Sequence, residues 1–129
     1  MRDGAAHHVH TVSTDRSSVA RLVRELPARV GFNFDPGNLK AVAPADKSFL
    51  VDLLNNRINY CHLKDWRHAG TGWLAGAPGD DDLDYGTLLP QLRYDGVYLI
   101  EYEPTADVEA GLQRSLDYFR RIGMELIFA

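Results

Sequence analysis

With 129 residues, of which 45% are hydrophobic and 25% charged, the chain has the composition of a folded globular protein and not that of a disordered or fibrous one. Its formal net charge of -4 at pH 7 disfavours a nucleic-acid partner, because phosphate binding needs a surplus of Lys and Arg, and we expect a small-molecule partner instead. A single cysteine, Cys61, and the lack of an apolar run long enough for a membrane span or a signal peptide favour a cytoplasmic protein with no membrane partner.

The first two predicted elements are a helix over residues 17–26 and a strand over residues 30–35. In the helix, apolar residues recur at three- and four-residue steps, and Asp15 or Ser17 is a suitable N-cap. In the strand, bulky side chains alternate with small or polar ones. One face of this strand is therefore apolar, and the other ends at the carboxylate of Asp35.

A second helix and a second strand follow. The helix opens between Pro44 and Asp46, buries Phe and Leu side chains between positions 49 and 54, and ends near residues 55–56. Residues 58–64 form the strand, in which His62 and Lys64 share one face. This strand also ends in polar side chains.

The next stretch, residues 65–84, is rich in Gly, Asp, Ala and Trp and predicts a loop of about twenty residues, a length that favours a binding function. Asp84 can then cap a short helix that continues to Leu92. Residues 97–103 are the clearest strand of the sequence, and residues 107–123 have the apolar spacing of an amphipathic helix.

The alternation of helices and strands predicts an α/β fold in one domain that spans residues 1–129. Strands joined through helices are parallel in such folds, and their carboxyl ends lie at one edge, where active groups collect. Asp35, His62 and Glu101 are placed at the ends of successive strands. We therefore expect their side chains to converge.

Each of these three residues has a simpler interpretation when it is taken alone. Asp35 could cap a turn or a helix, and His62 could be an ordinary core or surface histidine. Glu101 is harder to explain in this way, because a carboxylate inside an apolar strand needs a partner. Their equivalent positions favour a shared site.

Two carboxylates and one imidazole suit a divalent cation such as Mn²⁺, Mg²⁺, Co²⁺ or Zn²⁺. Such a cation can polarise a sugar carbonyl and stabilise the negative charge that develops when a neighbouring C–H proton is removed. The predicted metal site formed by Asp35, His62 and Glu101 therefore points to isomerase or epimerase chemistry.

Several residues after the second strand are candidates for substrate binding. Lys64, Arg67 and His68 could hold a hydroxyl or a phosphate, or could be plain surface charges. Trp66 and Trp73 could form the wall of a sugar pocket, or could pack the loop.

Two clusters of potential ligands have simpler explanations. The histidines between positions 7 and 10 fit a flexible N-terminal segment better than a metal site. The acidic run at 80–82 fits a solvated turn better than a cation site.

Four motifs in this order resemble the sugar phosphate isomerase/epimerase family with the xylose-isomerase-like TIM barrel. They are VGFNFDPGNL at 30–39, INYCHLKDW at 58–66, PGDDDLDYGTLLPQL at 78–92 and YDGVYLIEYEP at 94–104. The resemblance covers nearly the whole sequence and implies a partial (β/α) barrel, its C-terminal half, with about three to four parallel strands and crossover helices.

The resemblance also implies roles for individual residues. In this family a metal is held by acidic, Asp, His and Glu ligands from the fifth to eighth strands, and Asp35, His62 and Glu101 match the last three. Glu101 would in addition act as the acid/base group beside the metal. Arg67 is similar to a substrate-binding arginine, and Asn38 stands where many relatives have a histidine.

Part of the family pattern has no counterpart in this sequence. Residues 1–6 include no Glu that could end the fifth strand, and the first four strands are absent. We therefore expect a fragment, or a half-barrel that forms a homo-oligomer or is completed by another chain. The alternative to an enzyme is a noncatalytic remnant that binds metal or sugar, or that serves only as an interaction domain. A third possibility, a related metal-dependent nuclease, is disfavoured by the negative net charge.

Overall fold

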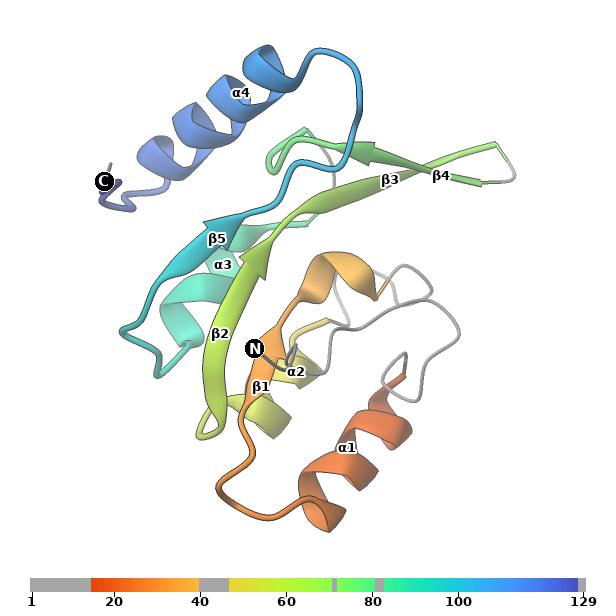
Figure 1. Cartoon of the computed structure of the whole chain (residues 1–129), viewed down its shortest axis with the longest axis vertical. Coiled ribbons are helices and arrows are strands. Elements are labelled where there is room, and N and C mark those ends of the chain that lie inside the picture. Colours follow the sequence, from red (N-terminus) through yellow and green to blue (C-terminus); the bar gives the residue numbers. More distant parts are fainter. Residues whose placement is uncertain (1–14, 40–46, 71, 81–82, 128–129) are drawn as a thin grey trace.

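The computed structural model describes residues 15–39, 47–70, 72–80 and 83–127 (Figure 1). The elements in chain order are α1 (Arg16–Glu25), β1 (Phe32–Phe34), the 3-10 helix η1 (Pro36–Asn38), α2 (Phe49–Leu54), β2 (Ile58–Leu63), β3 (Asp65–Ala69), β4 (Gly72–Gly76), α3 (Tyr85–Leu88), the 3-10 helix η3 (Leu89–Gln91), β5 (Tyr98–Ile100) and α4 (Val108–Arg121). The alternation of helices and strands matches the prediction, apart from the segment that contains β3 and β4.

Three of the strands form a parallel sheet in the order β1-β2-β5. Phe34 of β1 is opposite Cys61 of β2, and His62 of β2 is opposite Leu99 of β5. A parallel sheet whose strands are connected through helices is the layout of a (β/α) barrel. The predicted α/β fold with about three to four parallel strands is confirmed, and the parallel sheet has three of them.

The two faces of this sheet differ in what covers them. Helices α2 and α3 lie behind the sheet in Figure 1, and the β2 side chains that point toward the core, Cys61 and Leu63, are 0% and 1% exposed. Successive side chains of a strand point to opposite faces. Tyr60 of β2 and Leu99 of β5 are accordingly 41% and 42% exposed on the other face, which we call the open face.

All three parallel strands are shorter than predicted, and β2 ends one residue early, at Leu63. β1 begins at Phe32 and has an irregular register between Phe32 and Asn33, while β5 ends at Ile100. The hydrogen bonding of β5 nevertheless continues for one residue, because the N–H of Glu101 donates to the carbonyl oxygen of Leu63 at 3.0 Å. Glu101 is thereby fixed beside the end of β2.

The predicted loop at 65–84 was wrong for its first part. Residues 65–69 and 72–76 pair as an antiparallel hairpin, from Asp65↔Gly76 to Ala69↔Gly72. Gly70, with a φ of 60°, occupies the left-handed conformation at its turn. The Gly- and Ala-rich β4 has little intrinsic strand preference, and backbone pairing with β3 compensates for it.

Some predictions fall outside the described residues. These are the start of the second helix at 44–46, the histidines at 7–10, and the acidic residues 81 and 82. That helix is confirmed over Phe49–Leu54 as α2, whereas Lys47 and Ser48 form a turn. Within the described segments, no helix has the length and apolar character needed to cross a bilayer.

The buried thiol of Cys61 provides a test of this core. Burial raises the pKa of Cys61 from 9.0 to about 12, and the side chain is fully buried. Because the thiolate is the reactive form, a shift of about three units should slow alkylation at pH 8 roughly a thousand-fold relative to the urea-unfolded chain. Mass spectrometry after timed iodoacetamide treatment measures this ratio, and equal rates in the two states would contradict the described packing.

Candidate metal centre

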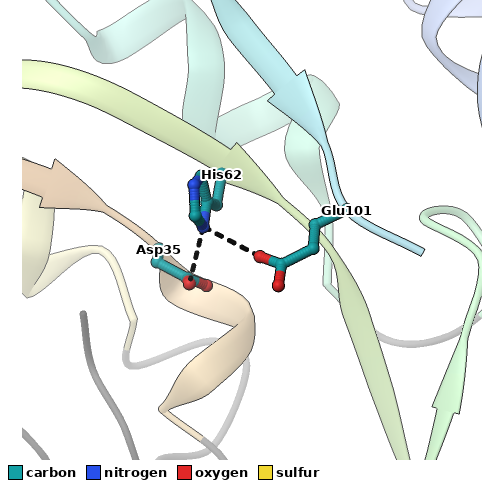
Figure 2. Close-up of side chains that lie close together, drawn as sticks. All are labelled: Asp35, His62 and Glu101. Carbon is teal, nitrogen blue, oxygen red and sulfur yellow. Dashed lines mark ion pairs between the residues drawn. The ribbon is translucent and has the colours of Figure 1, made fainter. Parts of the chain in front are cut away.

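The ends of the three parallel strands bring Asp35, His62 and Glu101 together. One ligand atom from each residue lies within 4.8 Å of those from the other two. Nδ1 of His62 is 2.8 Å from Oε2 of Glu101 and 3.6 Å from Oδ2 of Asp35. Figure 2 shows the carboxylates of Asp35 and Glu101 both directed at the same ring nitrogen of His62. The predicted convergence of these side chains is therefore present in the fold.

Asp35 is held by the turn that follows β1. Its carboxylate accepts a hydrogen bond from the backbone N–H of Asn38 (3.1 Å) and another from the side-chain Nδ2 of Asn38 (2.7 Å), so it caps η1. Gly37 lets this turn approach β2, since a Cβ at that position would lie 2.6 Å from Cγ of Lys64. Asp35 thus caps a helix, as its simpler interpretation predicts, and its carboxylate also faces the cluster. The residue has no exposed surface.

His62 is on the open face of β2, where its ring packs edge-on against Tyr60 at a centroid distance of 5.1 Å. The Asp35 carboxylate is the largest influence on its pKa and raises it, while partial burial lowers it and the charge of Glu101 raises it further. The pKa of His62 therefore lies above its ordinary value. The two carboxylates outweigh the opposing effect of the Lys64 charge on the imidazole.

The side chain of Lys64 is 3% exposed and lies among three carboxylates. Its Nζ is 2.6 Å from Glu103, 3.0 Å from Glu101 and 3.5 Å from Asp35. Burial alone would lower the pKa of Lys64, but the charge of Asp35 and the contacts with Glu103 and Glu101 outweigh it and raise the pKa. Lys64 is therefore a buried ammonium that is compensated by acidic neighbours.

Tyr85, at the start of α3, fixes the backbone of Lys64. Its hydroxyl accepts a hydrogen bond from the Lys64 N–H (3.0 Å) and donates one to the Lys64 carbonyl oxygen (2.7 Å). The ring is fully buried, and this burial raises the pKa of Tyr85 well above its usual value. The hydroxyl therefore remains protonated and holds the end of β2 in place.

The donor set of the cluster fits a divalent cation. Oε2 of Glu101 is buried and has no hydrogen-bond partner with suitable geometry among the described residues, although Nδ1 of His62 (2.8 Å) and Nζ of Lys64 (3.0 Å) are near it. A buried carboxylate oxygen in this state is favourably placed to coordinate a cation. Asp35, His62 and Glu101 could hold such an ion, with carboxylate oxygens and an imidazole nitrogen as its ligands.

The residues predicted to bind substrate are distributed over two regions. Asn38 and Lys64 are buried beside the cluster. Trp66 is half-buried on β3, and Arg67 is exposed on the same strand. Arg67 lines a cavity of about 430 Å³. The other polar residues that line this cavity are Asp80, Tyr102, Asp107 and Arg114. Asp35, His62 and Glu101 do not line it. The backbones of His68 and Trp73 are in the hairpin, and their side chains lie outside the described part.

Sequence reasoning missed Glu103 and Tyr85 as members of the site. Glu103 is two residues beyond Glu101, and the alternation of side chains along an extended chain could have placed both carboxylates on one side. Tyr85 gave no such signal, because an aromatic residue at the start of a short helix is ordinarily read as core. Its bond to Lys64, 21 residues away, depends on the tertiary fold.

A family model described as xylose isomerase-like TIM barrel matches residues 5–122 of the chain. No curated protein matches the chain. The matched range contains the three parallel strands and all three residues of the cluster. The resemblance expected from the four sequence motifs is confirmed by this match.

The Tyr85→Phe variant tests how the end of β2 is held. Removal of the hydroxyl leaves the N–H and the carbonyl of Lys64 buried without this partner, which should lower the free energy of unfolding by about 1–3 kcal/mol. Urea denaturation measures the change. The matched control is Tyr94→Phe. The hydroxyl of Tyr94 donates to an exposed backbone carbonyl, and its removal should lower the free energy of unfolding by less than about 0.5 kcal/mol. Equal effects of the two substitutions would contradict the role assigned to Tyr85.

Proposed function

The chain belongs to the xylose isomerase-like TIM barrel family, and from this premise we propose that it contributes the metal-binding site of a sugar or sugar-phosphate isomerase or epimerase. The observation that supports the proposal most directly is the convergence of Asp35, His62 and Glu101 at the ends of adjacent parallel strands. Active groups of (β/α) barrels lie at this end of the strands. The reaction would be aldose–ketose isomerisation or ketose epimerisation.

The three residues would have different parts in this chemistry. A bound Mn²⁺, Mg²⁺, Co²⁺ or Zn²⁺ would polarise the carbonyl of the sugar and stabilise the negative charge formed beside it. The carboxylate of Asp35 has no exposed surface, whereas that of Glu101 is 34% exposed. Glu101 is therefore the more accessible of the two carboxylates, and it would transfer the proton at the carbon next to the carbonyl.

Substrate contacts are proposed for Asn38, Lys64, Trp66 and Arg67. Arg67 is exposed and can donate hydrogen bonds to a sugar hydroxyl or to a phosphate. The buried Asn38 and Lys64 border the cluster and would act on the part of the sugar that enters it. Trp66 would provide an apolar surface for the sugar ring.

We further propose that the open face of the sheet is covered by a second copy of the chain or by a complementing half-barrel. The face exposes Tyr60 and Leu99, and β1 and β5 are its edge strands among the described segments. Exposed apolar side chains and unpaired strand edges both favour association.

Calorimetric titration tests the metal site. We expect Mn²⁺ or Zn²⁺ to bind the purified chain, and we expect His62→Ala to weaken this affinity at least roughly ten-fold because one of three protein ligands is lost. Asp117→Ala, which removes an exposed carboxylate of α4, is the control and should leave the affinity unchanged. Ketose epimerisation is then assayed with the metal-loaded protein. Binding without turnover would favour the noncatalytic remnant, and no binding would contradict the metal site.

Light scattering at micromolar concentration tests the association. The wild-type chain should be a dimer or a larger oligomer, and Leu99→Asp should shift it toward the monomer because a charge would then be buried in the interface. Leu74→Asp is the matched control, since Leu74 is an exposed leucine of the hairpin and lies outside the parallel sheet. A compact wild-type monomer would overturn the proposed self-association.

A further inference from the structure

The ammonium of Lys64 contacts both of the carboxylates that belong to the candidate metal site. Its Nζ lies 3.5 Å from Oδ2 of Asp35 and 3.0 Å from Oε2 of Glu101, and these two oxygens also face His62. The side chain is 3% exposed, so its charge is compensated mainly by protein groups and not by water. Lys64 therefore occupies the electrostatic position that a bound cation would need.

A divalent cation that is coordinated by Asp35 and Glu101 would come close to this ammonium. Two neighbouring positive groups repel each other, and the burial of Lys64 and Asp35 reduces the screening of this repulsion by solvent. The two cations also compete directly, because each is stabilised by the same carboxylate oxygens. Metal binding and the present contacts of Lys64 cannot both be fully retained.

Glu103 offers Lys64 an alternative partner. Its Oε1 is 2.6 Å from Nζ, which is the shortest of the three contacts, and Glu103 is outside the group of candidate ligands. The backbone of Lys64 is fixed on both its N–H and its carbonyl by Tyr85, while the four-carbon side chain is flexible. The ammonium can therefore move toward Glu103 without any change in the strand.

We propose that Lys64 is a built-in counter-cation of the metal site, which competes with the divalent ion for Asp35 and Glu101 and is drawn aside by Glu103 when the ion binds. This inference rests on the proposed metal-binding function. In the metal-free chain Lys64 reduces the repulsion between the carboxylates of Asp35 and Glu101, and in the metal-bound chain its charge limits the affinity for the metal ion. The interaction of Lys64 with Glu103 determines how much of this loss of metal affinity is avoided.

The test compares Mn²⁺ binding by the wild type, Lys64→Met and Glu103→Gln, with calorimetry and with thermal unfolding at fixed metal concentration. Lys64→Met should bind Mn²⁺ at least roughly ten-fold more tightly, because a competing charge is lost. It should also unfold at a lower temperature without metal and show a larger rise of the midpoint when metal is added. Glu103→Gln should bind Mn²⁺ more weakly than the wild type, since Lys64 then has only the two ligand carboxylates as partners.

Arg21→Met is the matched control for net charge. Arg21 is a 70% exposed residue of α1 that pairs with Glu25, and its replacement should leave the Mn²⁺ affinity unchanged. If Lys64→Met proves too unstable to titrate, the Mn²⁺ affinity of Glu103→Gln still tests the competition between Lys64 and the metal ion. Unchanged or weaker binding by Lys64→Met, or unchanged binding by Glu103→Gln, would overturn the role of Lys64 while leaving the metal site intact. A complete lack of binding in all variants would overturn both.

Discussion

The register between β2 and its two neighbours is the constraint on which the candidate site depends. His62 can meet both carboxylates only because Phe34 is paired with Cys61 on one side of β2 and Leu99 is paired with His62 on the other. A slip of one residue would turn the imidazole to the helix-covered face, since side chains alternate along a strand. The bond from the Glu101 N–H to the Leu63 carbonyl oxygen extends this register to the last ligand. Backbone pairing thus determines where the chemistry can occur.

Burial of charge is the second constraint, and the fold meets it with a local network. The carboxylate of Asp35 has no exposed surface and the side chain of Lys64 almost none, so each needs partners inside the protein. Asn38 donates two hydrogen bonds to Asp35, and Tyr85 fixes the backbone of Lys64. These contacts come from η1, the end of β2 and α3, which are separate segments of the sequence. The same groups that stabilise the metal-free chain therefore also determine how strongly it can attract a cation.

The sequence was informative where the pattern is local. Alternating apolar residues identified the three parallel strands, and the polar residues at their ends were sufficient to predict the cluster of Asp35, His62 and Glu101. The β3–β4 hairpin was missed because its Gly and Ala residues have weak strand preference and its pairing partner is supplied by the continuation of β2. The role of Tyr85 was missed because a hydroxyl in a core aromatic residue has no local signal. Both failures concern contacts that only the tertiary fold creates.

The family assignment and the geometry of the cluster support the same chemistry by different routes. The match over residues 5–122 indicates the barrel family, and the strand ends provide the ligand set. The most direct measurement is anomalous diffraction from crystals of this protein grown with Zn²⁺. We expect a zinc peak with an imidazole nitrogen of His62 and carboxylate oxygens of Asp35 and Glu101 each at roughly 2.0–2.2 Å. A zinc peak elsewhere, or an empty cluster at saturating Zn²⁺, would contradict it.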